Sequence, residues 1–137
     1  MKVFLTLLLV FNLALAEGNY ELKLFEKVLT GIFENHVIQI YVKDDDIKNM
    51  LEKSQIFALV DRCDTNTSLL VGKDFKNLSK ICQEKPVFTT NYRYYKSSPN
   101  VFGVFYWRKG RPQLKFKTKA IQIFHLNLPK YLNRYTQ

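Results

Sequence analysis

The sequence lacks the short motifs that mark the commonest enzyme sites. No serine lies in a Gly-x-Ser-x-Gly turn, no His-Glu-x-x-His pair is present, and Gly72-Lys73 is not part of a phosphate-binding loop. The sequence also contains no internal repeat, no low-complexity tract and no linker that would separate two domains. We therefore expect one domain that is not an enzyme and has no cofactor or metal ion.

Cysteine is scarce, with only two residues, so a scaffold held together by many disulfides is excluded. The chain does not need such a scaffold, because 47% of its residues are hydrophobic and 15% are aromatic. This composition also excludes disorder, a collagen helix and a coiled coil as descriptions of the whole chain.

Long apolar runs are absent after residue 17, and the single run before it predicts export. One positive charge at Lys2 precedes a nearly uninterrupted apolar run that ends in Ala14-Leu15-Ala16. This is the pattern of a cleaved signal peptide. We expect residues 1–16 to be removed and residues 17–137 to form one exported domain. An uncleaved N-terminal anchor is the alternative.

Acidic residues are fewer than basic ones: 21 lysine and arginine residues stand against 12 aspartate and glutamate residues, and the formal net charge is +9. If charge selects the partner, the partner is anionic. Basic and aromatic residues are interleaved in the C-terminal half, at Tyr92, Arg93, Tyr94, Tyr95, Lys96, Tyr106, Trp107, Arg108, Lys109, Arg111, Lys115, Lys117 and Lys119.

Interleaving of this kind can bind single-stranded nucleic acid, but an exported protein rarely meets it, so we expect no nucleic-acid partner. A solvated face of an edge strand is favoured. An anionic membrane surface or an acidic protein is the second interpretation. If a partner binds here, the predicted contact residues are Tyr106, Arg108, Lys109 and Arg111.

Helix and strand patterns alternate over the first part of the mature chain. Amphipathic helices are predicted over residues 20–33, 44–53 and 74–82, and strands over residues 37–42, 57–60, 69–72 and 87–90. Asp44, Asp45 and Asp46 would begin the second helix, and Asp74 would cap the third. The alternation predicts an α/β fold with a mainly parallel sheet.

The end of the chain predicts an antiparallel hairpin, because strand-like runs at residues 101–107 and 113–117 flank a turn that contains Gly110. Lys115 and Lys117 alternate with apolar residues, as on an edge strand. A helix from Thr118 and a segment restarted at Pro129 follow. The predicted fold class is α/β: a single-layer, mainly parallel sheet with helices on both faces and a C-terminal antiparallel hairpin, resembling one lobe of a periplasmic binding protein.

The two cysteines are suitably placed for a disulfide in this fold. Cys63 lies before the third strand, and Cys82 ends the helix that returns antiparallel to it, so both are expected at the same end of the sheet. Two separate buried thiols are the alternative. A catalytic or metal-binding cysteine is disfavoured, because no other Cys or His stands at ligand spacing.

Two further sets of residues are better explained by ordinary structural roles than by catalysis or metal binding. His36 and His125 could act as the base and acid of a secreted ribonuclease, but nothing in the sequence places them together. Asp44, Asp45 and Asp46 lack the spacing of an EF-hand, which favours helix capping over calcium binding.

The carboxyl ends of the strands remain as a candidate ligand site, because ligands of open α/β sheets bind there. The candidate ligand-binding residues are Lys73, Thr89, Thr90 and Asn91, beside Lys43 and Gly72. Ordinary capping by the threonine and asparagine side chains is the alternative.

Several segments resemble YfiR-type periplasmic proteins over residues 37–135. The similarity lies in Cys63-Asp64 followed by residues 69–72, in the strand at residues 86–90, in the hairpin from Gly103 to residue 116, and in Ala120, Leu126, Asn127, Leu128 and Leu132. Lys117 and Thr118 depart from the family, which often has an acidic residue and Asn there. Members also tend to be longer and to have more cysteines.

The resemblance implies a small exported α/β domain. The best-known members repress a membrane-bound diguanylate cyclase by binding its periplasmic sensor domain, and the redox state of their disulfides is among the controls. We therefore expect a non-enzymatic regulatory binding protein whose partner is the periplasmic domain of an inner-membrane signalling protein. A small periplasmic solute-binding protein is the alternative, and a homodimer is compatible with either.

Overall fold

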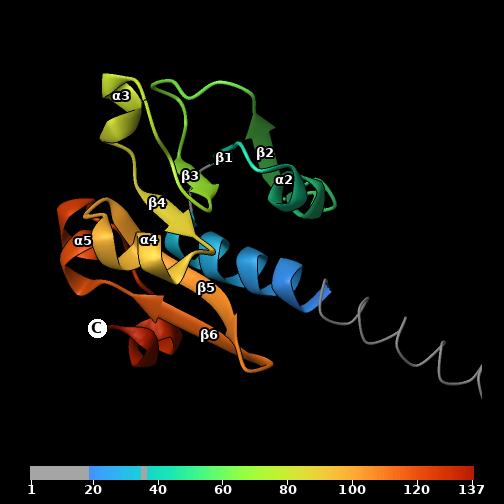
Figure 1. Cartoon of the computed structure of the whole chain (residues 1–137), viewed down its shortest axis with the longest axis vertical. Helices are drawn as coiled ribbons and strands as arrows, with labels where there is room; N and C mark the ends of the chain where they lie inside the picture. Colours follow the sequence, from blue (N-terminus) through green and yellow to red (C-terminus); the bar gives the residue numbers. More distant parts are fainter. Residues whose placement is uncertain (1–18, 35–36) are drawn as a thin grey trace, which may run out of the picture.

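The computed structural model describes residues 19–34 and 37–137 (Figure 1). The predicted signal peptide, residues 1–16, and His36 lie outside the described residues. In the part of the chain that is described, no helix is both long and apolar enough to cross a membrane.

Six strands form one sheet in the order β2-β1-β3-β4-β5-β6. The strands are β1 (Ile38–Val42), β2 (Phe57–Val60), β3 (Leu69–Gly72), β4 (Val87–Thr89), β5 (Val101–Arg108) and β6 (Arg111–Phe116). Neighbouring strands are parallel except β5 and β6, which form an antiparallel hairpin. The predicted α/β class, with a mainly parallel sheet and a C-terminal hairpin, is confirmed.

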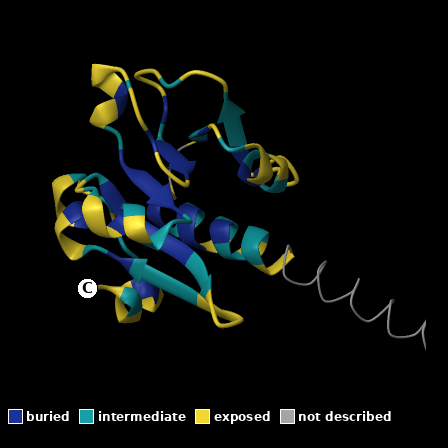
Figure 2. Cartoon of the chain, viewed as in Figure 1, coloured by how far each residue is buried: buried dark blue, intermediate teal, exposed yellow. Residues whose placement is uncertain are grey.

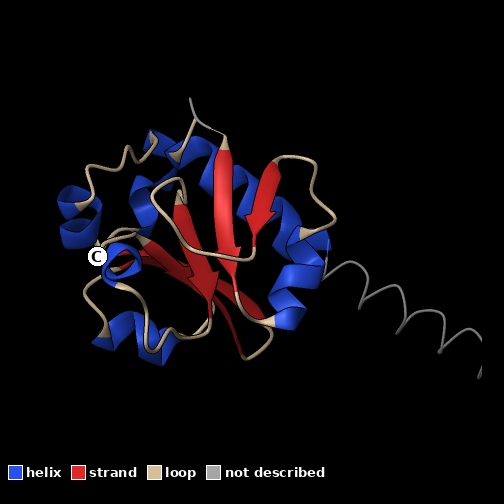
Figure 3. Cartoon of the chain, turned by 90° about the horizontal axis from the view of Figure 1, so that it is seen from above, coloured by secondary structure: helices blue, strands red, loops and turns tan. Residues whose placement is uncertain are grey.

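Helices lie on both faces of this sheet (Figures 1 and 3). The N-terminal helix, residues 19–32, packs through Phe25, Val28 and Leu29 into the larger of two core clusters. The others are α2 (Asp45–Leu51), α3 (Lys80–Gln83), α4 (Tyr92–Ser97), α5 (Thr118–Ile123) and the 3-10 helix η1 (Lys130–Tyr135). Helices α2, α5 and η1 join the larger cluster, whereas α4 packs through Tyr95 into the smaller one.

The central strands β3 and β4 are buried along their whole length (Figure 2). Successive strand residues point to opposite faces, so Leu69 and Val71 join the larger cluster and Leu70 joins the smaller one. This double coverage explains why these strands read as continuous apolar runs rather than as alternating patterns.

The helix predicted over residues 74–82 is wrong, because only Lys80–Gln83 is helical. Ser79 is its N-cap, and the Ser79 hydroxyl accepts a hydrogen bond from the Cys82 amide at 3.4 Å. Upstream, Asn77 has a left-handed backbone with φ of 58°, which a continuous helix cannot contain. Phe75 is buried because it packs beside Tyr41 on the smaller cluster, with ring centroids 6.1 Å apart, and not because it lies on a helix.

Helix α4 is an element that the sequence patterns did not predict. Asn91 begins it, because the Asn91 side chain accepts hydrogen bonds from the amides of Arg93 and Tyr94. The helix has only six residues and contacts β4 and β5. It thereby brings the tyrosine-rich segment onto the face of the C-terminal hairpin.

Candidate binding surface

The surface with the most distinctive chemistry lies where α4 covers the β5–β6 hairpin. We call it the α4–β6 face and define it as Tyr92, Tyr95, Lys96, Tyr106, Lys115 and Lys117. Val104 of β5 pairs with Lys115 of β6, and Tyr106 pairs with Gln113. Because side chains alternate along a strand, this register puts Tyr106, Lys115 and Lys117 on the side of the sheet that α4 covers.

Three tyrosine rings form the centre of the α4–β6 face. Tyr92 stacks on Tyr106 with centroids 4.9 Å apart and planes at 30°, and on Tyr95 with centroids 6.1 Å apart. Two ammonium groups lie over the Tyr92 ring, that of Lys115 at 4.9 Å and that of Lys96 at 5.7 Å. Cations so close to an aromatic ring are held by its quadrupole, which gives these flexible side chains a defined position.

The inner edge of the face is formed by Lys117 and Tyr95. The Lys117 ammonium donates hydrogen bonds to the carbonyl oxygens of Tyr95 at 2.6 Å and Ser98 at 2.9 Å. Burial lowers the pKa of Lys117. Burial, followed by the neighbouring Tyr92 and Tyr106, raises the pKa of Tyr95 to about 12. Both groups therefore serve the structure, and Tyr95 is the one buried member of the face.

Charge is divided unevenly along the chain. Residues 85–137 contain eleven lysine and arginine residues and no aspartate or glutamate, so all twelve acidic residues lie at or before Glu84. Both ion pairs within the described residues, Lys48 with Asp61 and Lys73 with Asp46, lie before residue 85. The α4–β6 face therefore belongs to a segment that carries three of its lysines, Lys96, Lys115 and Lys117, and no acidic side chain.

Of the four predicted contact residues, three lie exposed at the hairpin tip and one lies in the tyrosine stack. Arg108 pairs directly with Arg111 across the hairpin, and like charges in that position destabilise a sheet. Lys109 and Gly110 form the turn with φ of 51° and 74°. The structure thus brings Arg108, Lys109 and Arg111 together, beside but outside the stack that contains Tyr106.

The predicted ligand residues have partners within the protein. Thr89 is buried, and its hydroxyl donates to the Gly72 carbonyl oxygen at 2.6 Å and accepts from the Asn91 amide at 3.1 Å. Asn91 in turn caps α4. The contacts of Asn91 match the capping alternative, whereas the Thr89 hydroxyl joins β4 to the end of β3 and caps no helix. Thr90 lines a cleft of about 400 Å³ together with Met50 and Trp107.

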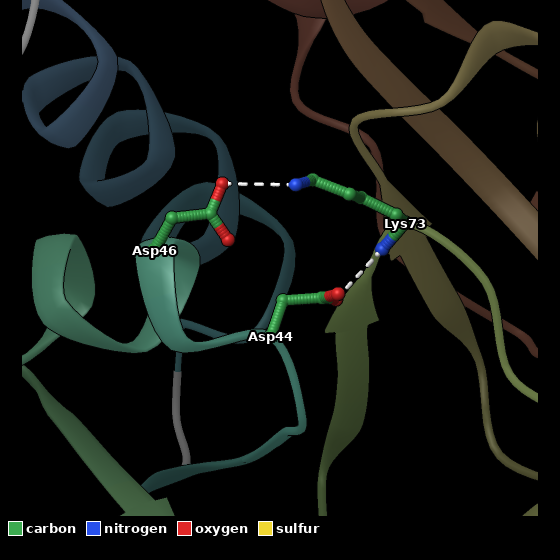
Figure 4. A network of polar contacts seen from close by, with 3 residues as sticks. All are labelled: Asp44, Asp46 and Lys73. Atoms are coloured by element: carbon green, nitrogen blue, oxygen red, sulfur yellow. Dashed lines mark hydrogen bonds and ion pairs between the residues drawn. The ribbon is translucent and has the colours of Figure 1, made fainter.

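Lys73, which directly follows β3, is held by two acidic residues that follow β1 (Figure 4). Its backbone amide donates to the Asp44 carboxylate at 2.9 Å, and its ammonium pairs with Asp46 at 3.0 Å. The hydrogen bond from Lys73 lowers the pKa of Asp46, and the same contact raises the pKa of Lys73. Asp44 stands at the N-cap position of α2, but its carboxylate joins the two strands instead of capping the helix.

Cys63 and Cys82 form a disulfide, with their Cα atoms 6.0 Å apart. The predicted pairing is therefore confirmed, although Cys82 lies on the four-residue α3 rather than on a longer helix. The bond joins the loop after β2 to the segment before β4. His125 is exposed with φ of 52°, and its predicted partner in a ribonuclease site, His36, lies outside the described residues.

No protein-family model matches the chain, and no curated protein sequence matches it. The resemblance to YfiR-type proteins therefore stays a prediction. Sequence reasoning found the basic hairpin but missed the tyrosine stack, since the stack depends on α4. The Asn91 cap followed by tyrosines three residues apart was the signal that could have revealed it.

Proposed function

We propose that this protein is an exported regulatory protein that acts by binding, and that its α4–β6 face and hairpin tip bind an acidic surface of a partner protein. The observation that carries this proposal is a stacked tyrosine cluster with cations over it, in a segment, residues 85–137, without any acidic residue. Tyrosine and arginine dominate the energetics of protein interfaces, and complementary charge accelerates association.

A protein partner accounts for this surface better than a lipid headgroup does. The rings of Tyr92 and Tyr106 are stacked on one another and half-buried, so they offer a preformed contact area that loses little entropy on binding. The exposed Arg108 and Arg111 can each bind a carboxylate through two hydrogen bonds. A fixed arrangement of this kind suits a partner with fixed carboxylates.

The partner that we propose is the periplasmic sensor domain of an inner-membrane signalling protein such as a diguanylate cyclase. Support for this choice comes from the resemblance to YfiR-type proteins. The protein would act by binding one conformation of the sensor more tightly than the other, which shifts the population of the two. The alternative, a small solute-binding protein, has less support, because Thr89 and Asn91 already bond within the fold.

Affinity capture from membranes of the native organism tests the proposal. The bait is the purified mature protein, used with the Cys63–Cys82 bond oxidised and reduced, and the retained membrane proteins are identified by mass spectrometry. A bait with Arg108→Glu and Lys109→Glu serves as the control. Retention of a sensor protein by the native bait and its loss from the charge-reversed bait would support the proposal. Equal retention by both baits, or retention by neither, would contradict it.

A further inference from the structure

A second surface feature lies on the opposite face of β6 from the α4–β6 face. It is a groove of about 500 Å³ between the N-terminal helix, β6 and η1. Its aliphatic lining comes from three separate elements: Leu24 and Val28 of the N-terminal helix, Leu114 of β6 and Leu132 of η1. Leu114 and Lys115 are neighbours in a strand and point to opposite faces, so this groove is separate from the proposed partner surface.

Three cations border this aliphatic lining, and no acidic residue does. Lys23 and Lys27 are exposed and lie four residues apart on the N-terminal helix, where like charges repel. Arg134 comes from η1 on the other side. Neither lysine nor Arg134 has an ion-pair partner among the described residues. Two of these cations lie over aromatic rings instead: the Lys27 ammonium is 5.3 Å from the Tyr131 centroid, and the Arg134 guanidinium is 5.0 Å from that of Tyr135.

The wall formed by η1 is fixed against the N-terminal helix before any ligand binds. The Tyr131 hydroxyl donates a hydrogen bond to the Lys27 carbonyl oxygen at 3.2 Å. Gly31 makes this close approach possible, because a Cβ atom there would collide with the Tyr131 hydroxyl and lie 3.1 Å from Pro129. A preformed groove loses little entropy when a ligand enters.

We infer that this groove binds a single-chain alkyl carboxylate, that is, a fatty-acid anion. The alkyl chain would lie on the partly exposed Leu24 and Leu114, above the buried Val28 and Leu132. Removing the chain and the exposed part of this lining from water drives its binding. The carboxylate would lie between the lysines and Arg134, where it offsets their mutual repulsion. The volume falls within the range of small-molecule sites. This inference does not depend on the proposed partner, because it concerns the other face of the hairpin.

The test is calorimetric titration of the mature protein with sodium dodecanoate, kept below the concentration at which it forms micelles. Dodecanol supplies the same chain without the charge, and acetate supplies the charge without the chain. Two double variants separate local from general charge effects. Lys23→Gln with Lys27→Gln removes two cations from the groove, whereas Lys76→Gln with Lys80→Gln removes two exposed lysines with the same four-residue spacing outside it.

We expect dodecanoate to bind saturably at one site, more tightly than dodecanol, and acetate not to bind. Dodecanoate affinity should fall about tenfold or more in the Lys23 and Lys27 variant and stay within about twofold in the Lys76 and Lys80 variant. Equal affinities for dodecanoate and dodecanol, or equal losses in the two variants, would overturn the inference. Binding to anionic vesicles without binding to monomeric dodecanoate would also overturn it and would identify a membrane surface instead.

Discussion

The Lys117 ammonium lies over the ring of Tyr95, 4.8 Å from its centroid, and donates a hydrogen bond to the carbonyl oxygen of the same residue. Lys117 directly follows β6 and Tyr95 lies in α4, so this double contact fixes the helix to the edge of the sheet. Tyr95 is only 3% exposed, and its hydroxyl also donates to the Gln137 side chain at 3.2 Å. The pair thus connects α4, the edge strand and the C-terminus.

Because the Tyr95 hydroxyl is buried, we expect the protein to lose stability in strongly alkaline solution. Burial raises its pKa to about 12, whereas the unfolded chain releases the proton near 10. Unfolding therefore releases a proton between about pH 10 and about pH 12, and the free energy of unfolding falls as pH rises through this interval. Urea unfolding at a series of pH values would show this fall, and Tyr95→Phe should flatten it.

Lys117 provides the comparison for this experiment, because its effect has the opposite sign. Burial lowers its pKa below the ordinary lysine value of 10.5, so the unfolded chain keeps the proton to higher pH than the folded chain. Its contribution to stability rises with pH until the ordinary value is reached. A profile for Tyr95→Phe that falls as steeply as that of the native protein would contradict the assignment to Tyr95.

We expect a side chain at Gly103 in β5 to collide with the core. A Cβ atom at this position would lie 2.8 Å from two ring atoms of Phe88 and 3.0 Å from the ring of Phe116. Both rings are fully buried, so they cannot move into solvent. Gly103→Ala should lower the free energy of unfolding by about 1–3 kcal/mol, measured by urea denaturation. Adding Phe88→Leu should recover part of the loss, and two independent, additive losses would speak against the contact.

The parallel strands were predictable from sequence because each is a short run rich in apolar residues, and β3 and β4 are covered on both faces. The predicted runs at residues 57–60 and 69–72 coincide with β2 and β3. The prediction of a helix from Asp74 was wrong because Phe75 and Leu78 pack on the smaller core cluster from an irregular loop. Their spacing in the sequence is the same as that of buried residues on a helix. The tertiary position of Phe75 overrode the local pattern.

The binding surfaces were only partly predictable for a different reason. The hairpin cations could be found because they are consecutive in sequence. Thr89 and Asn91 were ambiguous, since the same oxygen atoms can bond within the fold or hold a ligand, and the partner depends on the tertiary structure. The groove combines Leu24, Leu114 and Leu132, which are far apart in the chain, so no local pattern could reveal it.

The disulfide predicts a measurable contribution to stability. Cys63 and Cys82 are 19 residues apart, and closing a loop of this length stabilises a protein by about 3 kcal/mol in the chain-entropy model. The double variant Cys63→Ser with Cys82→Ser should therefore unfold at a lower urea concentration. The native protein under reducing conditions should match the variant. A reduced protein as stable as the oxidised one would contradict this prediction.

Asp44 and Asp46 both contact Lys73 but should differ in importance. The half-buried Asp44 carboxylate accepts a hydrogen bond from the Lys73 backbone amide and so joins the ends of β1 and β3. Asp44→Ala should cost about 1.5 kcal/mol, because it leaves that amide without its charged partner. Asp46 makes an exposed ion pair, and Asp46→Ala should leave the urea midpoint nearly unchanged. Equal effects of the two substitutions would rule out this difference.

The exposed cations of the hairpin tip predict how partner binding responds to charge. Arg108→Glu with Lys109→Glu replaces two positive charges by two negative ones next to the tyrosine stack, so an acidic partner would be repelled rather than attracted. We expect affinity for the captured partner, measured by surface plasmon resonance, to fall at least about tenfold, mainly through slower association. The native affinity should also weaken as salt concentration rises.

The matched control reverses two exposed lysines elsewhere, Lys76→Glu with Lys80→Glu, which changes the net charge by the same amount. If the hairpin tip contacts the partner, this control should weaken binding far less than the change at Arg108 and Lys109, because its charges lie outside the α4–β6 face. Equal losses would show that total charge, not this surface, attracts the partner. All four positions are exposed, and Arg108→Glu replaces the like-charge pair with Arg111 by an opposite-charge pair, so neither variant should unfold at a lower urea concentration than the native protein. A loss of affinity therefore reports on the surface and not on the fold.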